Sequence, residues 1–561
     1  MLKEKGAMLM LWDTMPDNIK RRYTWENGIL YSNKKELSNY YVKPLKHLTV
    51  PSGNGSFLLV RYFVGETETS FEKVLKIKDG KKIDIPDVLE LINFRRTAVN
   101  EIETMIKLQF PLEGDGEWYI DSIGWSKVGN KWLYCFGDRI LRDDFSEKIH
   151  VDSCGLKSFS IDESNLPSDR ETIKLIEELI HFNSVPVNIC LQYLVTSLLR
   201  SLFLDANVPP QFVLYIHGKT DSYKTTLAEY FFDIYRQNKG TSFAKEDLTS
   251  SSAALYTVLN GYKDCAFILD DLSDGISQSE TQRKRKLVND LIRTSANCQG
   301  RLTKVGNEVK GDILGCSLVF TAEYTLNVES IANRTIPLDM NKYPLSEDIL
   351  LFFHQNPRLF TAFSKMFIDW ATVNVDTILK SISRIWDYQR CSRKRFSQEQ
   401  RFHESASVLF IAGDILETFL EANGCRKNAY TSMLNNSILS VIGDGESIVG
   451  KIISSKSEFD IAREIVKLIN EKKIVFTPSV FNGDVYLTKE FLCIKPTYLA
   501  TKLNSINHHK TLSAIAKKET GFGYPAERIL ENWKLILLNQ FHDILPGSSI
   551  KEVYEDSKID Y

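Results

Sequence analysis

The sequence lacks paired cysteines, long apolar runs and an excess of either charge. Its nine cysteines stand singly, without a CxxC spacing, which is typical of reduced core cysteines in a cytoplasmic protein rather than of disulfides or a zinc knuckle. No apolar run approaches the roughly 18 residues of a membrane helix, so we predict no membrane span. With 70 Lys+Arg against 72 Asp+Glu the net charge is −2, which by itself favours neither nucleic acid nor membrane as a partner.

The length of 561 residues is too great for one small module, and at about 150 residues per domain it predicts three or four domains. Apolar residues make up 43% and charged residues 25%, as in folded globular proteins. Over residues 1–160, short apolar and aromatic runs between turn signals predict a β-rich domain with a helix near 88–106. From residue 167 a helix is expected, with Ser168 as its N-cap and Glu171 at the capping-box spacing.

Strand-like and helix-like patterns alternate from residue 211 to residue 340. The strand-like runs are FVLYI, AFILDD and SLVFTA, and helical patterns separate them. Such alternation predicts crossover connections and a parallel sheet, hence an α/β core over 167–345. Residues 346–450 have a mainly helical pattern. Residues 451–518 predict helix, strand, strand, helix, with IVFTPSV and DVYLTKEFLCI as the strands, which is typical of a winged-helix-like module.

The strongest chemical signal is the segment YIHGKTDSYKTT, in which an apolar strand turns into a helix. Gly218 begins the turn, and Lys224 and Thr225 follow at the spacing of the phosphate-binding motif G-x-x-x-x-G-K-[ST]. Tyr223 stands where the motif has its second glycine, although such a loop needs backbone dihedrals that glycine reaches most easily. We expect backbone amides and the Lys224 ammonium to bind nucleotide phosphates. The residues of this predicted loop are Gly218, Lys219, Thr220, Asp221, Ser222, Tyr223, Lys224, Thr225 and Thr226.

Acidic and polar residues end the two apolar runs that follow the loop. Asp270 closes FILD, where a carboxylate together with Thr225 is suited to hold Mg²⁺ beside nucleotide phosphates, and Asp271 is the candidate that orients or deprotonates the attacking water. Glu323, with Thr321 at the end of the third run, is a candidate contact to the γ-phosphate or the water. Arg334 is a candidate arginine finger for a neighbouring subunit's nucleotide. A strand-end turn and a surface arginine are the alternative interpretations of these last two residues.

The segments GKTDSYKTT, FILDD, VFTAE and NRTIP together resemble the additional-strand P-loop ATPases. The resemblance covers residues from about 170 to 345 and is closer to the helicase-like ATPases of bacterial mobile genetic elements, which are similar to AAA+ and hexameric replicative helicases. It implies a P-loop NTPase core that uses ATP and Mg²⁺. It also implies ATP hydrolysis coupled to DNA unwinding or translocation by a homo-oligomer, usually a ring.

Two basic clusters support DNA as a partner. QRKRK places Arg283, Lys284, Arg285 and Lys286 on or before a helix, and CSRKRF adds the cluster at 393–395. Such clusters neutralise backbone phosphates, although a short charge run is more often a solvated helix face. In a winged helix, residues 497–506 would form the helix that enters the major groove.

The last forty residues follow a different pattern. GYPAERILENWKLILLNQFHDILPGSS, within residues 521–557, resembles a segment of class II α-mannosidases, which are zinc-dependent retaining glycosidases. By that resemblance His542 is a Zn²⁺ ligand. A catalytic zinc needs about three protein ligands, and glycoside hydrolysis needs a pair of carboxylates. The chain offers no convincing match for either set. We interpret the single HxD motif, His150-Val151-Asp152, as a chance occurrence. We therefore expect residues 519–561 to be an α-mannosidase-like fragment, catalytically incomplete, fused to the ATPase.

The sequence thus predicts an ATP-dependent, helicase-like ATPase of a mobile element, with a β-rich N-terminal domain, a P-loop core, a helical region and a winged-helix-like module. One alternative is a DNA-binding or scaffold protein that binds nucleotide without hydrolysing it, because of Tyr223 in the loop. A second alternative is an α-mannosidase-related fusion, for which Zn²⁺ would be the cofactor.

Overall fold

The computed structural model groups the chain into two compact units, Met1–Glu446 and Ser447–Tyr561. No helix among the described residues is long and apolar enough to cross a membrane. The described residues are 12, 15–51, 56–65, 69–78, 82–85, 91–109, 117–137, 139–141, 148–152, 156, 159, 161, 163–235, 245–247, 252–272, 278–298, 301–305, 308–312, 314–393, 400–449, 485–487 and 492–494.

The N-terminal region is rich in β-strands, as expected. Strands β1 to β3 form one antiparallel sheet, and a six-stranded sheet has the order β12-β8-β4-β5-β6-β7. The described helix α3 begins at Ala98 and ends at Gln109, later than the helix that the pattern predicts near 88–106. The element bounds are α2 Asp17–Lys20, β1 Tyr23–Glu26, β2 Ile29–Ser32, β3 Lys35–Ser38, β4 Tyr40–Thr49, β5 Ser56–Val64, β6 Thr69–Lys78, β7 Lys82–Asp84, β8 Glu117–Ile120 and β12 Ile149–Val151.

A small antiparallel sheet of β9 (Gly124–Val128), β10 (Lys131–Phe136) and β11 (Arg139–Leu141) packs on the α/β core. The buried Asp264 accepts hydrogen bonds from the Trp125 amide, at 2.9 Å, and from the Ser201 amide, at 2.6 Å. The Tyr134 hydroxyl donates to the Asp264 carbonyl at 2.9 Å. These contacts fix the small sheet to the core through one buried aspartate.

Helices α4 (Asp169–His181), α5 (Val185–Leu198) and α6 (Arg200–Asp205) lead into the core. Ser168 is the N-cap of α4, as predicted, and its hydroxyl accepts a hydrogen bond from the Glu171 amide at 3.4 Å. Every residue of α5 from Pro186 to Leu198 is buried, including the polar Asn188, Gln192, Thr196 and Ser197.

The core contains a five-stranded, all-parallel sheet with the strand order β14-β15-β18-β13-β19. The predicted parallel α/β core is therefore correct. Strand β18 lies between β13 and β15, so the carboxyl ends of these three strands meet at one edge of the sheet. The bounds are β13 Val213–His217, α7 Lys224–Phe232, β14 Lys245–Asp247, α8 Ser252–Leu259, β15 Ala266–Leu272, α9 Gln278–Ala296, β16 Arg301–Val305, β17 Glu308–Asp312, β18 Ser317–Ala322, α10 Glu329–Ala332 and β19 Thr335–Asp339.

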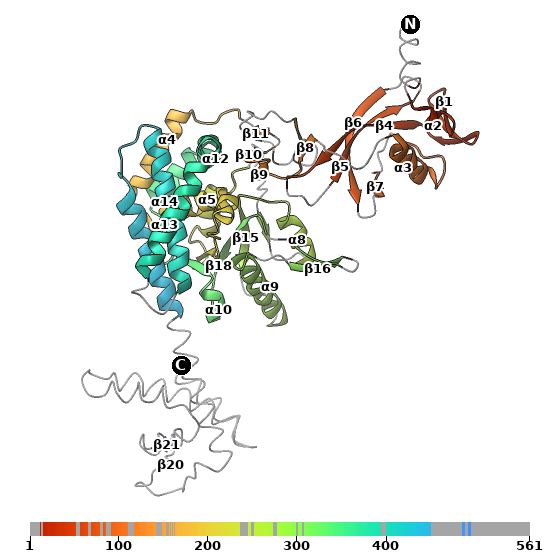
Figure 1. The fold of residues 1–561 in the computed structure, drawn as a ribbon. Helices are drawn as coiled ribbons and strands as arrows, with labels where there is room; N and C mark the ends of the chain where they lie inside the picture. Colours follow the sequence, from red (N-terminus) through yellow and green to blue (C-terminus); the bar gives the residue numbers. More distant parts are fainter. Residues whose placement is uncertain are drawn as a thin grey trace. The chain divides into compact units, whose positions relative to one another are not determined.

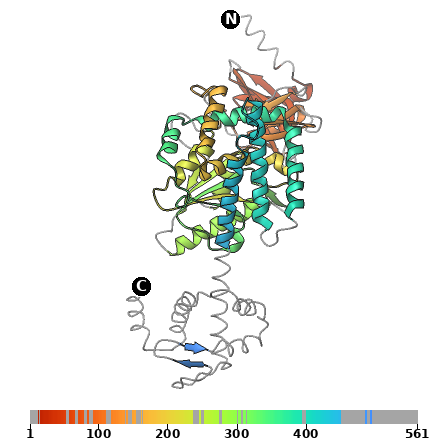
Figure 2. The same cartoon turned by 90° about the vertical axis from the view of Figure 1, so that its left-hand side faces the viewer.

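The region after the sheet is helical, as expected. Helices α12, α13 and α14 run beside one another and α14 also packs on α5 (Figures 1 and 2). Further along, the run DVYLTKEFLCI contains two short antiparallel strands rather than the single predicted strand, and the rest of 451–518 lies outside the described residues. The bounds are α11 Glu347–Gln355, α12 Leu359–Val373, α13 Val375–Arg393, α14 Gln400–Ala422, a helix over 431–449, β20 Val485–Leu487 and β21 Leu492–Ile494.

Candidate functional site

The loop between β13 and α7 contains two non-glycine residues in the left-handed region of backbone space. Tyr223, which takes the place of the motif's second glycine, lies in the left-handed region with φ 59° and ψ 25°. Asp221 also has a positive φ of 61°. The Tyr223 side chain is 51% exposed, so the ring points into space rather than into the core. Tyr223 therefore holds a left-handed backbone conformation that is strained for tyrosine and that glycine would adopt without strain.

Gly218 is required where it stands. A Cβ on this residue would lie 2.8 Å from the Ser222 hydroxyl and 3.1 Å from the Met340 Cβ. The Gly218 amide donates to the Ala322 carbonyl at 3.1 Å, which ties the start of the loop to the end of β18. The first glycine of the motif thus serves the close packing of the loop against β18 and β19.

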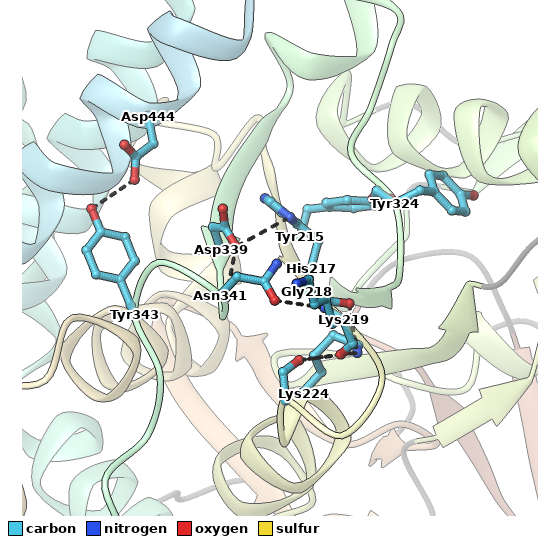
Figure 3. A network of polar contacts seen from close by, with 11 residues as sticks. Tyr215, His217, Gly218, Lys219, Lys224, Tyr324, Asp339, Asn341, Tyr343 and Asp444 are labelled. Carbon is cyan, nitrogen blue, oxygen red and sulfur yellow. Dashed lines mark hydrogen bonds and ion pairs between the residues drawn. The ribbon is translucent and has the colours of Figure 1, made fainter. Parts of the chain in front are cut away.

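Lys224, the first residue of α7, folds its ammonium back over the loop. Its Nζ donates to the carbonyls of Gly218, at 3.0 Å, and Lys219, at 2.7 Å (Figure 3). It also lies 3.4 Å from the Ser222 hydroxyl. The ammonium and the first amides of α7 thus lie at the same turn. A helix N-terminus with an adjacent cation favours an anion such as a phosphate.

Asp270 lies across the sheet edge from this loop. Its Oδ1 accepts hydrogen bonds from the hydroxyls of Thr225, at 2.8 Å, and Thr321. The Asp270 side chain is buried, and the β15–β18 register shifts between Leu269 and Leu272. Such a bulge changes the direction of side chains next to a site. The structure thus brings together Thr225, Asp270 and Thr321, which come from α7, β15 and β18.

Glu323 also reaches the loop. Its carboxylate accepts a hydrogen bond from the Thr220 hydroxyl at 2.7 Å, so the residue that follows β18 contacts the middle of the loop. Asp271 is the residue after Asp270 in β15, for which the structure describes the backbone only. The water-orienting role of Asp271 stays a prediction.

Arg334 lies at the opposite edge of the sheet. It directly precedes β19, which is parallel to β13, and five residues of strand span about 15 Å. Its guanidinium donates to the Asn297 side chain and to the Ser330 carbonyl. Burial, with the nearby cations of Arg401 and Arg293, lowers the pKa of Arg334. This arginine is therefore remote from the phosphate loop of its own chain.

The four cations of the basic run in α9 lie on two different faces of the helix, one exposed and one partly buried. Arg283 and Lys286 are exposed, whereas Lys284 lies 3.8 Å from Glu280 and Arg285 lies over the Tyr324 ring at 4.9 Å. Only two of the four predicted cations are thus free to face a partner from the exposed side of α9. The side chains of the second cluster, at 393–395, lie outside the described residues.

A polar network beside the loop was not predicted from the sequence. The backbone amide of Lys219 donates to the side-chain oxygen of Asn341 at 3.0 Å. The backbone amide of Asn341 donates to the Asp339 carboxylate at 2.9 Å. His217 Nδ1 lies 4.0 Å from Asp339 Oδ1, and burial lowers the pKa of this histidine. Asn341 follows β19, a strand that the sequence analysis did not predict, so no local pattern pointed to this residue.

In the described part of the chain, no three His, Cys, Asp or Glu side chains are grouped to hold a metal ion. His150, of the lone HxD sequence, contacts Glu117 at 2.5 Å within the six-stranded sheet. Of the described cysteines, Cys135, Cys190, Cys265 and Cys316 are buried, and Cys298 and Cys425 are partly buried. His542 lies outside the described residues.

The fold is similar to that of a solved helicase. The structure described as "SCCmec type IV Cch - active helicase" matches with a TM-score of 0.55 over 86% of this chain and 90% of that one, at 11% sequence identity. A JCV helicase structure covers 49% of this chain and 72% of its own at 12% identity, with a TM-score of 0.22, from which we draw nothing. The first likeness establishes a helicase-like fold, as the sequence predicted.

A different family matches the end of the chain. The model of the alpha mannosidase middle domain matches residues 497–561. Mouse (Mus musculus) Alpha-mannosidase 2C1 is 45% identical over 49 residues, which are 9% of this chain. The chain spans only 5% of the length of that relative. The predicted α-mannosidase-like segment is thus confirmed as a resemblance, and its structure lies outside the described residues.

Proposed function

We propose that the chain is a helicase-type ATPase that hydrolyses ATP with Mg²⁺ and couples this reaction to movement along DNA. The observation that supports the proposal most directly is the meeting of Lys224, Thr225 and Asp270 at the carboxyl edge of one parallel sheet. Ligands of α/β proteins bind at this edge. The helicase-like fold adds support from an independent direction.

The phosphate loop supplies the binding contacts. The Lys224 ammonium would exchange the Gly218 and Lys219 carbonyls for phosphate oxygens, and the amides at the start of α7 would donate to the same oxygens. The amides of α7 are held in place by the helix before the nucleotide arrives, so only the ammonium has to move on binding. Positioning and charge neutralisation are the main catalytic contributions in phosphoryl transfer.

The Thr225 and Asp270 oxygens fit Mg²⁺. They lie 2.8 Å apart, and neighbouring ligands of an octahedral ion with bonds of 2.0–2.1 Å are about 2.9 Å apart. Their hard hydroxyl and carboxylate oxygens are the donors that Mg²⁺ prefers. When bound, the ion would neutralise part of the charge of the nucleotide phosphates. Asp270 would then give up its hydrogen bond with Thr225 and keep that with Thr321.

The attacking water would be positioned from β15 and β18. We assign this role to Asp271, with Glu323 holding the loop through Thr220. Arg334 would act on the nucleotide of a neighbouring copy, since it lies at the far edge of its own sheet. This role would require a homo-oligomer in which each copy completes the next site, and a ring would satisfy that requirement for every copy.

DNA would contact the exposed face of α9. Arg283 and Lys286 are three residues apart on that face, so both can reach one phosphate backbone. The test is the salt dependence of single-stranded DNA binding. The Arg283→Ala/Lys286→Ala variant should lower the salt slope by about 1.4, since each lost contact on a single strand removes roughly 0.7. The control Lys284→Ala should leave the slope unchanged, and an unchanged slope in the double variant would remove α9 from the interface.

The test of the ATPase is Lys224→Ala. Loss of a phosphate-binding cation should lower turnover by about 100-fold or more. Lys46→Ala is the matched control, because Lys46 pairs with Glu117 at 3.1 Å in the six-stranded sheet. Turnover that survives Lys224→Ala in a clean preparation would refute the site. Nucleotide binding without turnover in the unmodified chain would instead establish the non-hydrolysing scaffold.

A further inference from the structure

The segment that follows β19, residues 339–343, connects the phosphate loop to the helix over 431–449. We call it the strap. On one side the Met340 amide donates to the His217 carbonyl at 2.8 Å, next to the loop. On the other side the Tyr343 hydroxyl donates to Asp444 at 2.8 Å (Figure 3). The Lys342 ammonium also donates to Asp444, at 2.5 Å. Five consecutive residues thus span the distance between the loop and the helical region.

Asn341 is the residue of the strap that holds the loop. Its side-chain oxygen accepts from the Lys219 amide at 3.0 Å, while its own amide donates to the Asp339 carboxylate at 2.9 Å. Asn341 is therefore fixed at both its side chain and its backbone. The Lys219 carbonyl, in turn, accepts from the Lys224 ammonium at 2.7 Å. The peptide units on the two sides of Lys219 are tied to the strap and to the phosphate-binding lysine.

The outer end of the strap is held by Asp444 of the 431–449 helix. The two carboxylate oxygens of Asp444 are divided between the Lys342 ammonium and the Tyr343 hydroxyl. The Tyr343 amide also donates to the Asp339 carbonyl at 2.9 Å, which closes a turn within the strap. A displacement of the 431–449 helix at Asp444 would therefore move the turn that carries Asn341.

We propose that Asn341 is a positioning residue of the nucleotide site, which orders the phosphate loop before nucleotide binds, and that Asp444 anchors it to the 431–449 helix. The proposal rests on the proposed ATP site for its role in turnover. The hydrogen bond from Lys219 to Asn341 is independent of that function. A loop that is already ordered loses less conformational entropy when the ligand binds, so the hydrogen bond between Lys219 and Asn341 should increase the affinity for nucleotide.

The first test is hydrogen exchange of the peptide that covers residues 218–224, measured without nucleotide. Asn341→Ala removes the acceptor of the Lys219 amide and should speed exchange about three- to tenfold. Asn341→Asp keeps an acceptor at the same place and should retain the protection. Asn423→Ala is the matched control, since Asn423 donates to the Phe419 carbonyl at 2.9 Å at the end of α14. Unchanged exchange in Asn341→Ala would overturn the proposal.

The second test is the dissociation constant for Mg·ADP. Asn341→Ala should weaken binding by the same three- to tenfold, and Asp444→Ala should change exchange and affinity in the same direction by a smaller factor. If Asp444→Ala alters neither, the anchor is wrong and the strap ends at Asn341. If the unmodified chain binds no nucleotide, the proposed function fails, whereas the exchange experiment still decides whether Asn341 orders the loop.

Discussion

Tyr223 allows the cost of the missing glycine to be measured. An L-residue in the left-handed region costs about 1–2 kcal/mol, and Tyr223 has φ 59°. Its ring is 51% exposed, so deleting it loses about 1 kcal/mol of apolar burial. Tyr223→Gly should therefore change the stability of the bound loop by less than about 1 kcal/mol, because the two terms nearly cancel.

The informative comparison is between Tyr223→Gly and Tyr223→Ala. Both delete the ring, but only alanine keeps the Cβ that opposes the left-handed backbone. Mg·ADP affinity should thus be about five- to thirtyfold higher for the glycine variant, which corresponds to 1–2 kcal/mol. Tyr223→Val should bind more weakly still, because a β-branched residue is an outlier at positive φ.

The assay is titration calorimetry or displacement of a fluorescent nucleotide, with ATP turnover measured on the same preparations. Tyr223→Asn is the control, since asparagine tolerates the left-handed conformation and should bind close to the glycine variant. Equal affinity of the glycine, alanine and valine variants would refute the reasoning, because the loop would then not need this conformation in order to bind phosphate.

Two further predictions concern buried polar groups. Asp264→Ala should destabilise the first unit by about 2–5 kcal/mol in urea unfolding, since it leaves the Trp125 and Ser201 amides buried without their acceptor; a loss below 1 kcal/mol would contradict this. Burial lowers the pKa of His217 below its ordinary 6.5, so the unfolded chain binds a proton that the folded chain does not, and stability falls as the pH drops below about 6.5. His217→Asn should lose less stability than the unmodified chain between pH 7 and pH 5, and parallel pH curves would argue against this contribution.

Local pattern was enough to predict the parts of the candidate site that lie within one turn of chain. The run FVLYI, the loop and the lysine that begins α7 are neighbours in sequence, so their chemistry can be predicted from spacing alone. Asp270 was likewise predicted as the end of an apolar strand. The helix of 88–106 was placed too early, since α3 begins at Ala98 and boundaries depend on packing that periodicity does not record.

The sequence by itself predicted a phosphate loop followed by acidic and polar strand ends, because strand and helix periods and turn residues are local properties. Only the tertiary structure decided that β18 lies between β13 and β15, which brings Thr321 to Asp270, and that Asn341 reaches Lys219 over 122 positions of chain. It also placed Arg334 at the amino end of β19, opposite the carboxyl ends of the parallel strands. Strand order and long-range hydrogen bonds depend on which apolar faces bury one another, and that choice involves the whole chain at once.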